Sequence, residues 1–527
     1  MHHIDTQISL CSRRYAHNND NFIPVLKDQS ALAALDELHS KFVLTPVDKA
    51  SKNIALICKP FYIKCIFDEL FRFQNNIPSD SIFANLFNDS IPTYSVNHKT
   101  ANEIIISQFK FMKTDIYMNS VVYDDFNRLP IIYMMPKFHK TPIKFRFIVA
   151  SKDSSLKPLA SALSLALKEI RKQRKFYCHK LSNYDGINRY WVIENTQPIL
   201  DCVDELNNNH NVNTIATYDF SELYTSLPHD EIYTNISNII VSIFDYRTRK
   251  GLPTKLCVYK SNKADKIWST VRWVKKPRAG TFYFTKESML KSLSYQLNNT
   301  CFTFGGLVFD QNCGIPMGID DGPEIANLNL HQLEYQHLNE LKKVDIHQAR
   351  ILNFTFRFID DISSLNSNDY ILDHAVEIYG HSVLLNKENT GLLNANVLDL
   401  TITLDQNSRL CSTKLFDKRR AFNFTIVNYP DLTGNISSKL SHGIINSQLI
   451  RFYKCCSESV DFIHNCNLFF VCLLEKGFKQ YSIEDRFKSF LKSHKPHMKY
   501  NIFSPNVLFQ SVHSHISSCN IVVSPRP

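Results

Sequence analysis

Glycine is scarce in this 527-residue chain, with only 13 residues, so collagen-like and other glycine-rich repeats are excluded. Long apolar runs are also missing. The longest run in the C-terminal third, residues 468–474, ends at Glu475 and is far too short to cross a bilayer. Residues 1–10 contain no basic region followed by an apolar stretch, so no secretory signal is visible. The sequence therefore predicts an intracellular protein without a membrane partner.

The 14 cysteines include no C-x-x-C arrangement. Cys455 and Cys456 form the only close pair, and adjacent cysteines rarely bridge without strain. Scattered thiols are typical of a reducing compartment rather than of a disulfide framework or a zinc ribbon. We therefore expect no disulfide-linked partner and a location in the nucleus or cytoplasm, with the nucleus slightly favoured. The oligomeric state stays open.

What the chain does contain is a large apolar fraction and a concentrated positive charge. Hydrophobic residues make up 44% and aromatics 12%, enough for a large packed core. Residues 137–180 hold twelve Lys or Arg and two acids, so this stretch carries the whole net excess of +10. Such a segment indicates a polyanion partner, although a solvated helix face would look the same.

The region 212–404 has the clearest rhythm of strands and helices. It predicts, in order, a strand at 214–218 that ends at Asp219, a helix from Pro228 onward, a hairpin at 354–365 that turns at Asp360-Asp361, a helix at 371–378, and a strand at 382–385. This order is a split β-α-β arrangement, in which the first strand and the hairpin can lie side by side. Asp219 would then lie beside Asp360 and Asp361.

Three converging carboxylates suit two-metal phosphoryl transfer. Two Mg²⁺ ions about 4 Å apart stabilise the attacking and leaving oxygens, and they need carboxylates on rigid, adjacent strand ends; Mn²⁺ is possible in their place. A Phe-x-Asp-Asp string alone is more often a solvated turn. The two carboxylate-bearing strands favour the catalytic interpretation, while a two-metal nuclease remains open.

Eight segments resemble, in order, the reverse transcriptases of the Penelope-like element group. The segments are Pro46 to Ala50, Met135 to Lys140, Lys144 to Val149, Thr217 to Pro228, Gly314 to Gly318 with Gly322 to Asn327, Arg357 to Ile362, Lys414 to Arg419 and Ser447 to Arg451. The resemblance covers roughly residues 40 to 495.

The resemblance implies an α+β right-hand polymerase with fingers, a split β-α-β palm and a helical thumb. The expected boundaries are a loosely ordered segment at 1–38, fingers and N-terminal part at 39–212, palm at 213–410, primer grip and thumb at 411–495, and a tail at 496–527. It implies an RNA-directed DNA polymerase of a retroelement that extends a DNA primer on an RNA template with dNTPs.

The resemblance also assigns roles to side chains. Asp219, Asp360 and Asp361 would be the catalytic metal ligands, and Tyr224 a steric gate against ribonucleotides. The remaining nucleotide-binding residues would be Lys144, Arg146, Gly314 and Gly318, with Arg146 favoured because a guanidinium forks onto phosphate oxygens. Nucleic acid would contact Lys137, Lys140, Arg171, Lys172, Arg174, Lys175, Lys418 and Arg419.

Some features depart from the family pattern. Asp320 and Asp321 add two acids close to where template would pass, and they would repel phosphate. A domesticated, inactive nucleic-acid-binding protein of the same fold therefore stays an alternative, beside an RNA-dependent RNA polymerase, which Tyr224 disfavours.

After His494 only 33 residues remain (527 minus 494), too few for an appended nuclease domain. We expect a polymerase that does not cut DNA to make its primer.

Overall fold

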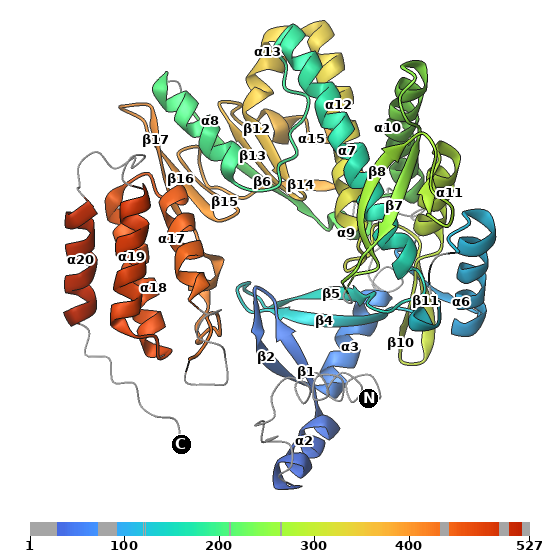
Figure 1. Cartoon of the computed structure of the whole chain (residues 1–527), viewed down its shortest axis with the longest axis horizontal. Coiled ribbons are helices and arrows are strands. Elements are labelled where there is room, and N and C mark those ends of the chain that lie inside the picture. Colours follow the sequence, from blue (N-terminus) through green and yellow to red (C-terminus); the bar gives the residue numbers. More distant parts are fainter. Residues whose placement is uncertain are drawn as a thin grey trace, which may run out of the picture.

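The chain is described by a computed structural model over residues 29–71, 92–119, 121, 123–209, 212–263, 266–432, 442–494 and 505–518. It is a mixed helix and sheet structure with five sheets (Figure 1). Among the described helices, none is long and apolar enough to cross a membrane.

A four-stranded sheet lies at the centre, in the order β12-β13-β6-β14. Its strands are β6 (Ile215–Ser221), β12 (Thr355–Phe358), β13 (Asp361–Leu365) and β14 (Leu384–Lys387). The predicted split order is present: β6 leads through α10 (His229–Arg249) to the β12–β13 hairpin, and β13 pairs directly with β6. The predicted helix at 371–378 is broken at His374 into α14 (Tyr370–Asp373) and α15 (Ala375–Tyr379), and Gly380 ends it at a positive φ of 78°.

The N-terminal part combines a hairpin with a five-stranded sheet of order β3-β11-β10-β4-β5. Its elements are α2 (Gln29–Lys41), β1 (Phe42–Val47), β2 (Ala50–Cys58), α3 (Lys59–Leu70), β3 (Tyr94–Asn97), α6 (Ala101–Lys110), η2 (Phe111–Asp115), η3 (Tyr123–Phe126), β4 (Ile131–Lys137), β5 (Lys144–Ala150), β10 (Cys301–Phe304) and β11 (Leu307–Gln311). The prediction of a loosely ordered segment at 1–38 is wrong for residues 29–38, which begin α2; residues 1–28 lie outside the described part.

Long helices support the central sheet. They are α7 (Lys157–Asp185), α11 (Lys286–Asn298) and α12 (Gly322–Val344), with α9 (Leu223–Ser226), α13 (Ile346–Ile351), η4 (Leu352–Phe354) and a small sheet of β7 (Lys255–Lys260), β8 (Trp268–Val274) and β9 (Tyr283–Phe284). Together with α10 they enclose the largest apolar core, in which Leu163, Ile236, Phe284 and Leu328 are fully buried. Burial of this apolar surface holds the sheet in place.

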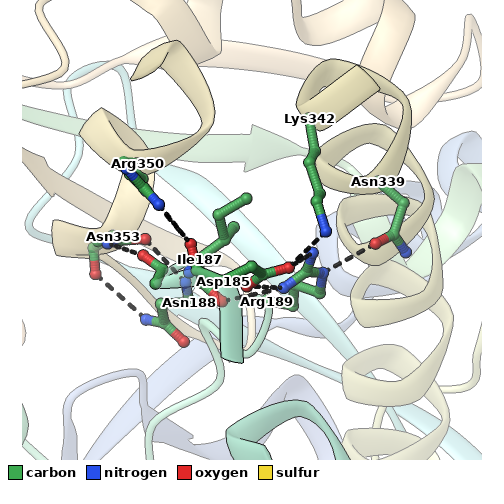
Figure 2. A network of polar contacts seen from close by, with 9 residues as sticks. Asp185, Ile187, Asn188, Arg189, Asn339, Lys342, Arg350 and Asn353 are labelled. Atoms are coloured by element: carbon green, nitrogen blue, oxygen red, sulfur yellow. Dashed lines mark hydrogen bonds and ion pairs between the residues drawn. The ribbon is translucent and has the colours of Figure 1, made fainter. Parts of the chain in front are cut away.

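A polar network fixes the far end of α7 (Figure 2). Asp185 pairs with Arg189 and with Lys342 of α12, and Arg189 also donates to Asn339 at 2.8 Å. Arg350 of α13 donates to the Asp185 carbonyl oxygen. The hydrogen bond from Arg189, partly opposed by burial, keeps the pKa of Asp185 well below its usual range. The carboxylate therefore stays charged and joins α7 to α12, while the backbone carbonyl of the same residue joins α7 to α13.

The C-terminal part contains a second core built from helices and a three-stranded sheet. Its elements are α8 (Gln197–Asn208), β15 (Asn394–Val397), β16 (Leu400–Asp405), β17 (Leu410–Leu415), η5 (Lys418–Ala421), α17 (Gly443–Cys455), α18 (Ser459–Glu475), α19 (Gln480–His494) and α20 (Pro505–Ser518). Helix α20 packs beside α18 and α19 and buries Val512 (Figure 1). The predicted tail at 496–527 thus contains a helix at residues 505–518, which lies beside the other C-terminal helices.

Candidate active site

Strands β6 and β13 bring two of the predicted carboxylates face to face. Asp219 lies directly opposite Asp361 in their antiparallel register, and Asp360 stands in the turn just before Asp361. Asp219 and Asp361 are half-buried. Residues Ile215 to Tyr218 of β6 are buried on both faces of the sheet, so Asp219 is the first residue of the strand with a partly exposed side chain.

The turn that carries Asp360 is stabilised by a hydrogen bond from a buried arginine. Arg357 is fully buried, pairs with Glu334 of α12, and donates to the Ile359 carbonyl oxygen at 3.0 Å. Ile359 adopts a φ of 56°, which is unusual for a β-branched residue. Backbone strain of this kind clusters at functional sites, where surrounding contacts fix it. The position of Asp360 therefore depends on the Arg357–Glu334 pair.

The carboxylates repel one another. The pKa of Asp219 is raised to about 6, first by burial and then by the negative charges of Asp360 and Glu388. Burial, followed by Asp360, raises the pKa of Asp361 to about 6 as well. Lys418 lowers both values in part. Anions held together against their mutual repulsion form a site that gains from a bound cation.

These carboxylates open into a cleft of about 2430 Å³, larger than the roughly 300–1,000 Å³ of small-molecule pockets. The volume suits a polymeric substrate. Of the residues that the sequence assigned to nucleotide or nucleic acid, the following line it: Lys137, Lys140, Lys144, Arg146, Tyr224, Gly318 and Lys418. The same cleft is thus lined by the three carboxylates and by these cations.

Tyr224 and the two glycines lie at close backbone crossings. The Tyr224 carbonyl oxygen accepts from the Ile315 amide at 2.8 Å, and a Cβ on Gly314 would lie 2.3 Å from that same oxygen. A Cβ on Gly318 would lie 2.3 Å from the Val149 carbonyl oxygen. Both glycines have positive φ values. Here their small size admits the protein's own backbone, which differs from the predicted approach of template or nucleotide.

Two of the predicted nucleic-acid contacts are wrong. Arg171 is buried against Glu324, and Arg174 is buried against His331 and Gln332, because α7 packs onto α12. Lys172 and Lys175 of the same helix are exposed, but they lie outside the cleft.

The position of Arg419 also differs from the one that the sequence predicts. It pairs with Asp417 at 2.8 Å and does not line the cleft, whereas the next residue, Arg420, does. Arg420 is exposed and donates to Asn465 at 2.7 Å. The turn of η5 explains the change, since consecutive residues of a helical turn point in different directions.

The predicted repulsion by Asp320 and Asp321 is also wrong. Asp320 pairs with Lys157 at 2.5 Å. Asp321 is fully buried, and burial raises its pKa to about 8, so its carboxyl group is mostly neutral at pH 7. Neither residue lines the cleft. The acids that cast doubt on activity are therefore neutralised.

Sequence reasoning missed Asp48, Glu388 and Arg420. Glu388 lines the cleft and adds to the charge around Asp219, although Asn386-Lys387-Glu388 reads as a polar turn. Asp48 belongs to a segment that was matched without a role, and it pairs with Arg146 at 3.1 Å. The sequence around Asp48 carries no signal for this contact, because Arg146 lies far along the chain.

The donor set fits Mg²⁺, a hard cation that takes oxygen ligands. Within the described part of the chain, no group of three or more His, Cys, Asp or Glu side chains is arranged so that it could hold a metal ion by itself. Mg²⁺ usually binds through one or two carboxylates, with water and substrate phosphates as its other ligands. Asp219, Asp360 and Asp361 at the edge of an open cleft match that mode.

Comparison with known proteins shows the fold. No family model and no curated protein matches the sequence. Telomerase from Candida albicans, solved with the TWJ fragment of telomeric RNA, is similar with a TM-score of 0.56 at 12% identity, over 92% of this chain and 73% of that chain. Apo telomerase from Candida tropicalis gives 0.43 at 12% identity, over 91% and 70%. A structure described as an RdRp complex gives 0.34 at 13% identity, over 74% and 31%. The similarity to the Candida albicans telomerase shows a reverse-transcriptase-like polymerase fold.

Proposed function

We propose that the protein is an RNA-directed DNA polymerase that extends a primer 3′ end with dNTPs by two-metal phosphoryl transfer. The observation that carries the proposal is the pairing of Asp219 with Asp361, beside Asp360, at the edge of a cleft lined by cations. The similarity of the fold to that of telomerase supports the proposal, and two bound metal ions would stabilise the reacting oxygens of phosphoryl transfer.

Each group in the cleft would have a defined task. Asp219, Asp360 and Asp361 would hold two Mg²⁺ ions, which would supply charge stabilisation to the reacting oxygens. Arg146 and Lys144 on β5 would bind the triphosphate, because charge-assisted hydrogen bonds to phosphate are strong. Burial raises the pKa of Tyr224, the charge of Asp360 adds to this shift, and Arg146 opposes it. The ring therefore lies near both charged groups and would face the sugar.

The finer assignment rests on the order of motifs. We propose a reverse transcriptase of the Penelope-like retroelement group, with fingers at 39–212, palm at 213–410 and thumb from 411. An RNA template is supported by the telomerase neighbour, which was solved with telomeric RNA. The choice of dNTPs follows from Tyr224, since a bulky ring leaves little room for a 2′-hydroxyl, and a DNA primer is proposed from the resemblance.

A primer-extension assay tests the proposal. Purified protein is incubated with oligo-dT annealed to poly-rA, dTTP and Mg²⁺, in parallel with the Asp219→Asn variant. We expect extension by the wild type and none by the variant. Absence of extension by the wild type under Mg²⁺ and Mn²⁺, with normal primer–template binding, would instead support an inactive nucleic-acid-binding protein.

Two further arms separate the remaining alternatives. Extension with UTP equal to that with dTTP would indicate an RNA polymerase. Nicking of supercoiled plasmid that depends on Asp219 would indicate a nuclease. The inactive alternative has lost its main support, because Asp320 is paired and Asp321 is buried.

A further inference from the structure

The turn between β1 and β2 brings a buried acid to the edge of the cleft. The turn consists of Asp48 and Lys49, and Lys49 has a φ of 64°. The hairpin is fixed to β4 by two bonds: the Asp48 amide donates to the Pro136 carbonyl oxygen at 3.1 Å, and the Thr45 hydroxyl donates to the Met134 carbonyl oxygen at 2.7 Å. The Asp48 side chain is 3% exposed, so it lies behind the cleft wall and does not line it.

Asp48 is surrounded by positive charge. Its Oδ1 pairs with Nη1 of Arg146 at 3.1 Å, while the Arg146 side chain remains 34% exposed. Lys137, opposite Lys144 in the β4–β5 register, has a pKa lowered first by burial and then by Arg146, and Asp48 opposes that shift. Asp48 is thus the anion that allows these cations to stand close together.

The hydrogen bonding of the polar groups around Asp48 is incomplete. Among the described residues, three buried polar atoms of these groups have no hydrogen-bond partner: Asp48 Oδ2, Arg146 Nε and His139 Nδ1. Buried polar groups are nearly always paired, so unpaired atoms in a cluster whose members Lys137, His139 and Arg146 line the cleft are what a ligand-binding site would show. Arg146 contacts Asp48 through Nη1, while 34% of its side chain stays exposed where it lines the cleft.

We propose that Asp48 is a positioning residue that holds the Arg146 guanidinium on the cleft wall, ready to bind the triphosphate of an incoming nucleotide. The inference rests on the proposed function. Without the buried carboxylate, Arg146 would be repelled by Lys137 and Lys144 and would turn toward solvent. Asp48 itself does not touch the nucleotide, because a carboxylate beside a triphosphate would repel it.

The first test is the Asp48→Asn variant, which keeps the shape and removes the charge. We expect the KM for dTTP to rise about ten-fold, as is typical when a supporting partner is lost. The kcat and the Kd for primer–template should stay within about two-fold. The matched control is Asp153→Asn, which weakens the half-buried Arg128–Asp153 pair outside the cleft and should leave the KM unchanged. An unchanged KM in Asp48→Asn would overturn the proposal.

The second test is a double-mutant cycle with Arg146→Ala, read out by calorimetric binding of dTTP without primer–template. If Asp48 acts through Arg146, the double variant binds no more weakly than Arg146→Ala alone. Additive losses, or a loss of melting temperature that accounts for weaker binding, would show a general structural role and overturn the proposal. The cycle needs no turnover. A wild type that binds dTTP but fails to extend primers would contradict the proposed function, while the cycle still decides the role of Asp48.

Discussion

Arg171 of α7 and Glu324 in the first turn of α12 form a buried, bidentate ion pair, with Nε–Oε2 at 2.6 Å and Nη2–Oε1 at 3.1 Å. The pair joins the basic stretch to the segment Gly322 to Asn327, two features that the sequence presented as separate. Part of the positive charge that the sequence assigned to nucleic-acid binding is therefore neutralised by an ion pair inside the protein.

Replacing Arg171 should destabilise the protein. Arg171→Ala leaves Glu324 buried without its partner, so we expect a loss of about 3–5 kcal/mol in the free energy of unfolding. The adjacent Lys172 is exposed, and Lys172→Ala should change stability by no more than about 0.5 kcal/mol. Urea denaturation of both variants measures the difference. Equal stability of the two would show that the Arg171–Glu324 pair contributes nothing.

Removing a site carboxylate should separate activity from stability. Asp219→Asn should lower extension by at least about 100-fold, since electrostatic groups at reacting centres contribute that much. Asp360→Asn should do the same, and Asp361→Asn should have a smaller effect. Because the pKa of Asp219 is raised, its charge is unfavourable in the metal-free fold, and Asp219→Asn should raise the melting temperature at pH 7.5. Asp204→Asn, on the exposed face of α8, is the control for both readouts. A variant that retains near-normal extension would contradict the metal-ligand assignment.

The central sheet could be predicted from the sequence because its pattern is local. Alternating Phe354, Phe356 and Phe358 identify a strand, and Asp360-Asp361 identifies its turn. The pairing of Asp219 with Asp361 followed from the rule that sequential strands tend to be neighbours. What periodicity cannot show is which charged side chains pair across the core. Arg171 and Arg174 read as surface charges because Glu324 and His331 lie more than 150 positions away.

The same limit applies to Asp48 and Asp321. Nothing near Asp48 in the sequence indicates that the β1–β2 turn meets Arg146, since that contact is set by packing of the hairpin on β4. Asp321 reads as an exposed acid at a helix start, yet burial keeps it neutral. Motif order predicted that Asp219 would lie beside Asp361, as the strand register has it, while the protonation and pairing of the neighbouring groups required the three-dimensional arrangement.

Extension should depend on protonation of the site. Asp219 and Asp361 have pKa values raised to about 6, so both hold protons below that pH and cannot bind Mg²⁺. We expect kcat/KM to fall as pH decreases through about 6, and the midpoint to move lower at higher Mg²⁺, because the metal competes with the proton. For the metal-free fold the sign is opposite: the stability from these carboxyls is present below about pH 4 and is lost as pH rises through about 6. A pH–rate profile at two Mg²⁺ concentrations measures the first effect, and a midpoint independent of Mg²⁺ would contradict it.

Tyr224 should set the choice of sugar. Tyr224→Ala opens space where a 2′-hydroxyl would lie, so we expect the preference for dTTP over UTP to fall roughly ten-fold or more. Tyr224→Phe keeps the ring and should leave the preference unchanged. The ratio of kcat/KM values on poly-rA measures both. If Tyr224→Ala keeps the wild-type ratio, the ring is a side chain that only packs against the largest apolar core, and the gate lies elsewhere.

Electrostatic binding of the primer–template should come from the cleft and not from the outer face of α7. Lys140, Lys418 and Arg420 line the cleft, whereas Lys168, Lys172 and Lys175 are exposed on α7 outside it. Each set of three can be changed to Gln, which removes the same net charge. Binding of a fluorescent RNA–DNA duplex without Mg²⁺, measured from 50 to 300 mM salt, gives the slope of log K against log salt. Each phosphate contact contributes about 0.9 to that slope. We therefore expect the cleft variant to lose about 2–3 units and the α7 variant less than about one. An equal loss in both would mean that net charge alone governs binding, and a larger loss in the α7 variant would place the nucleic acid along that helix.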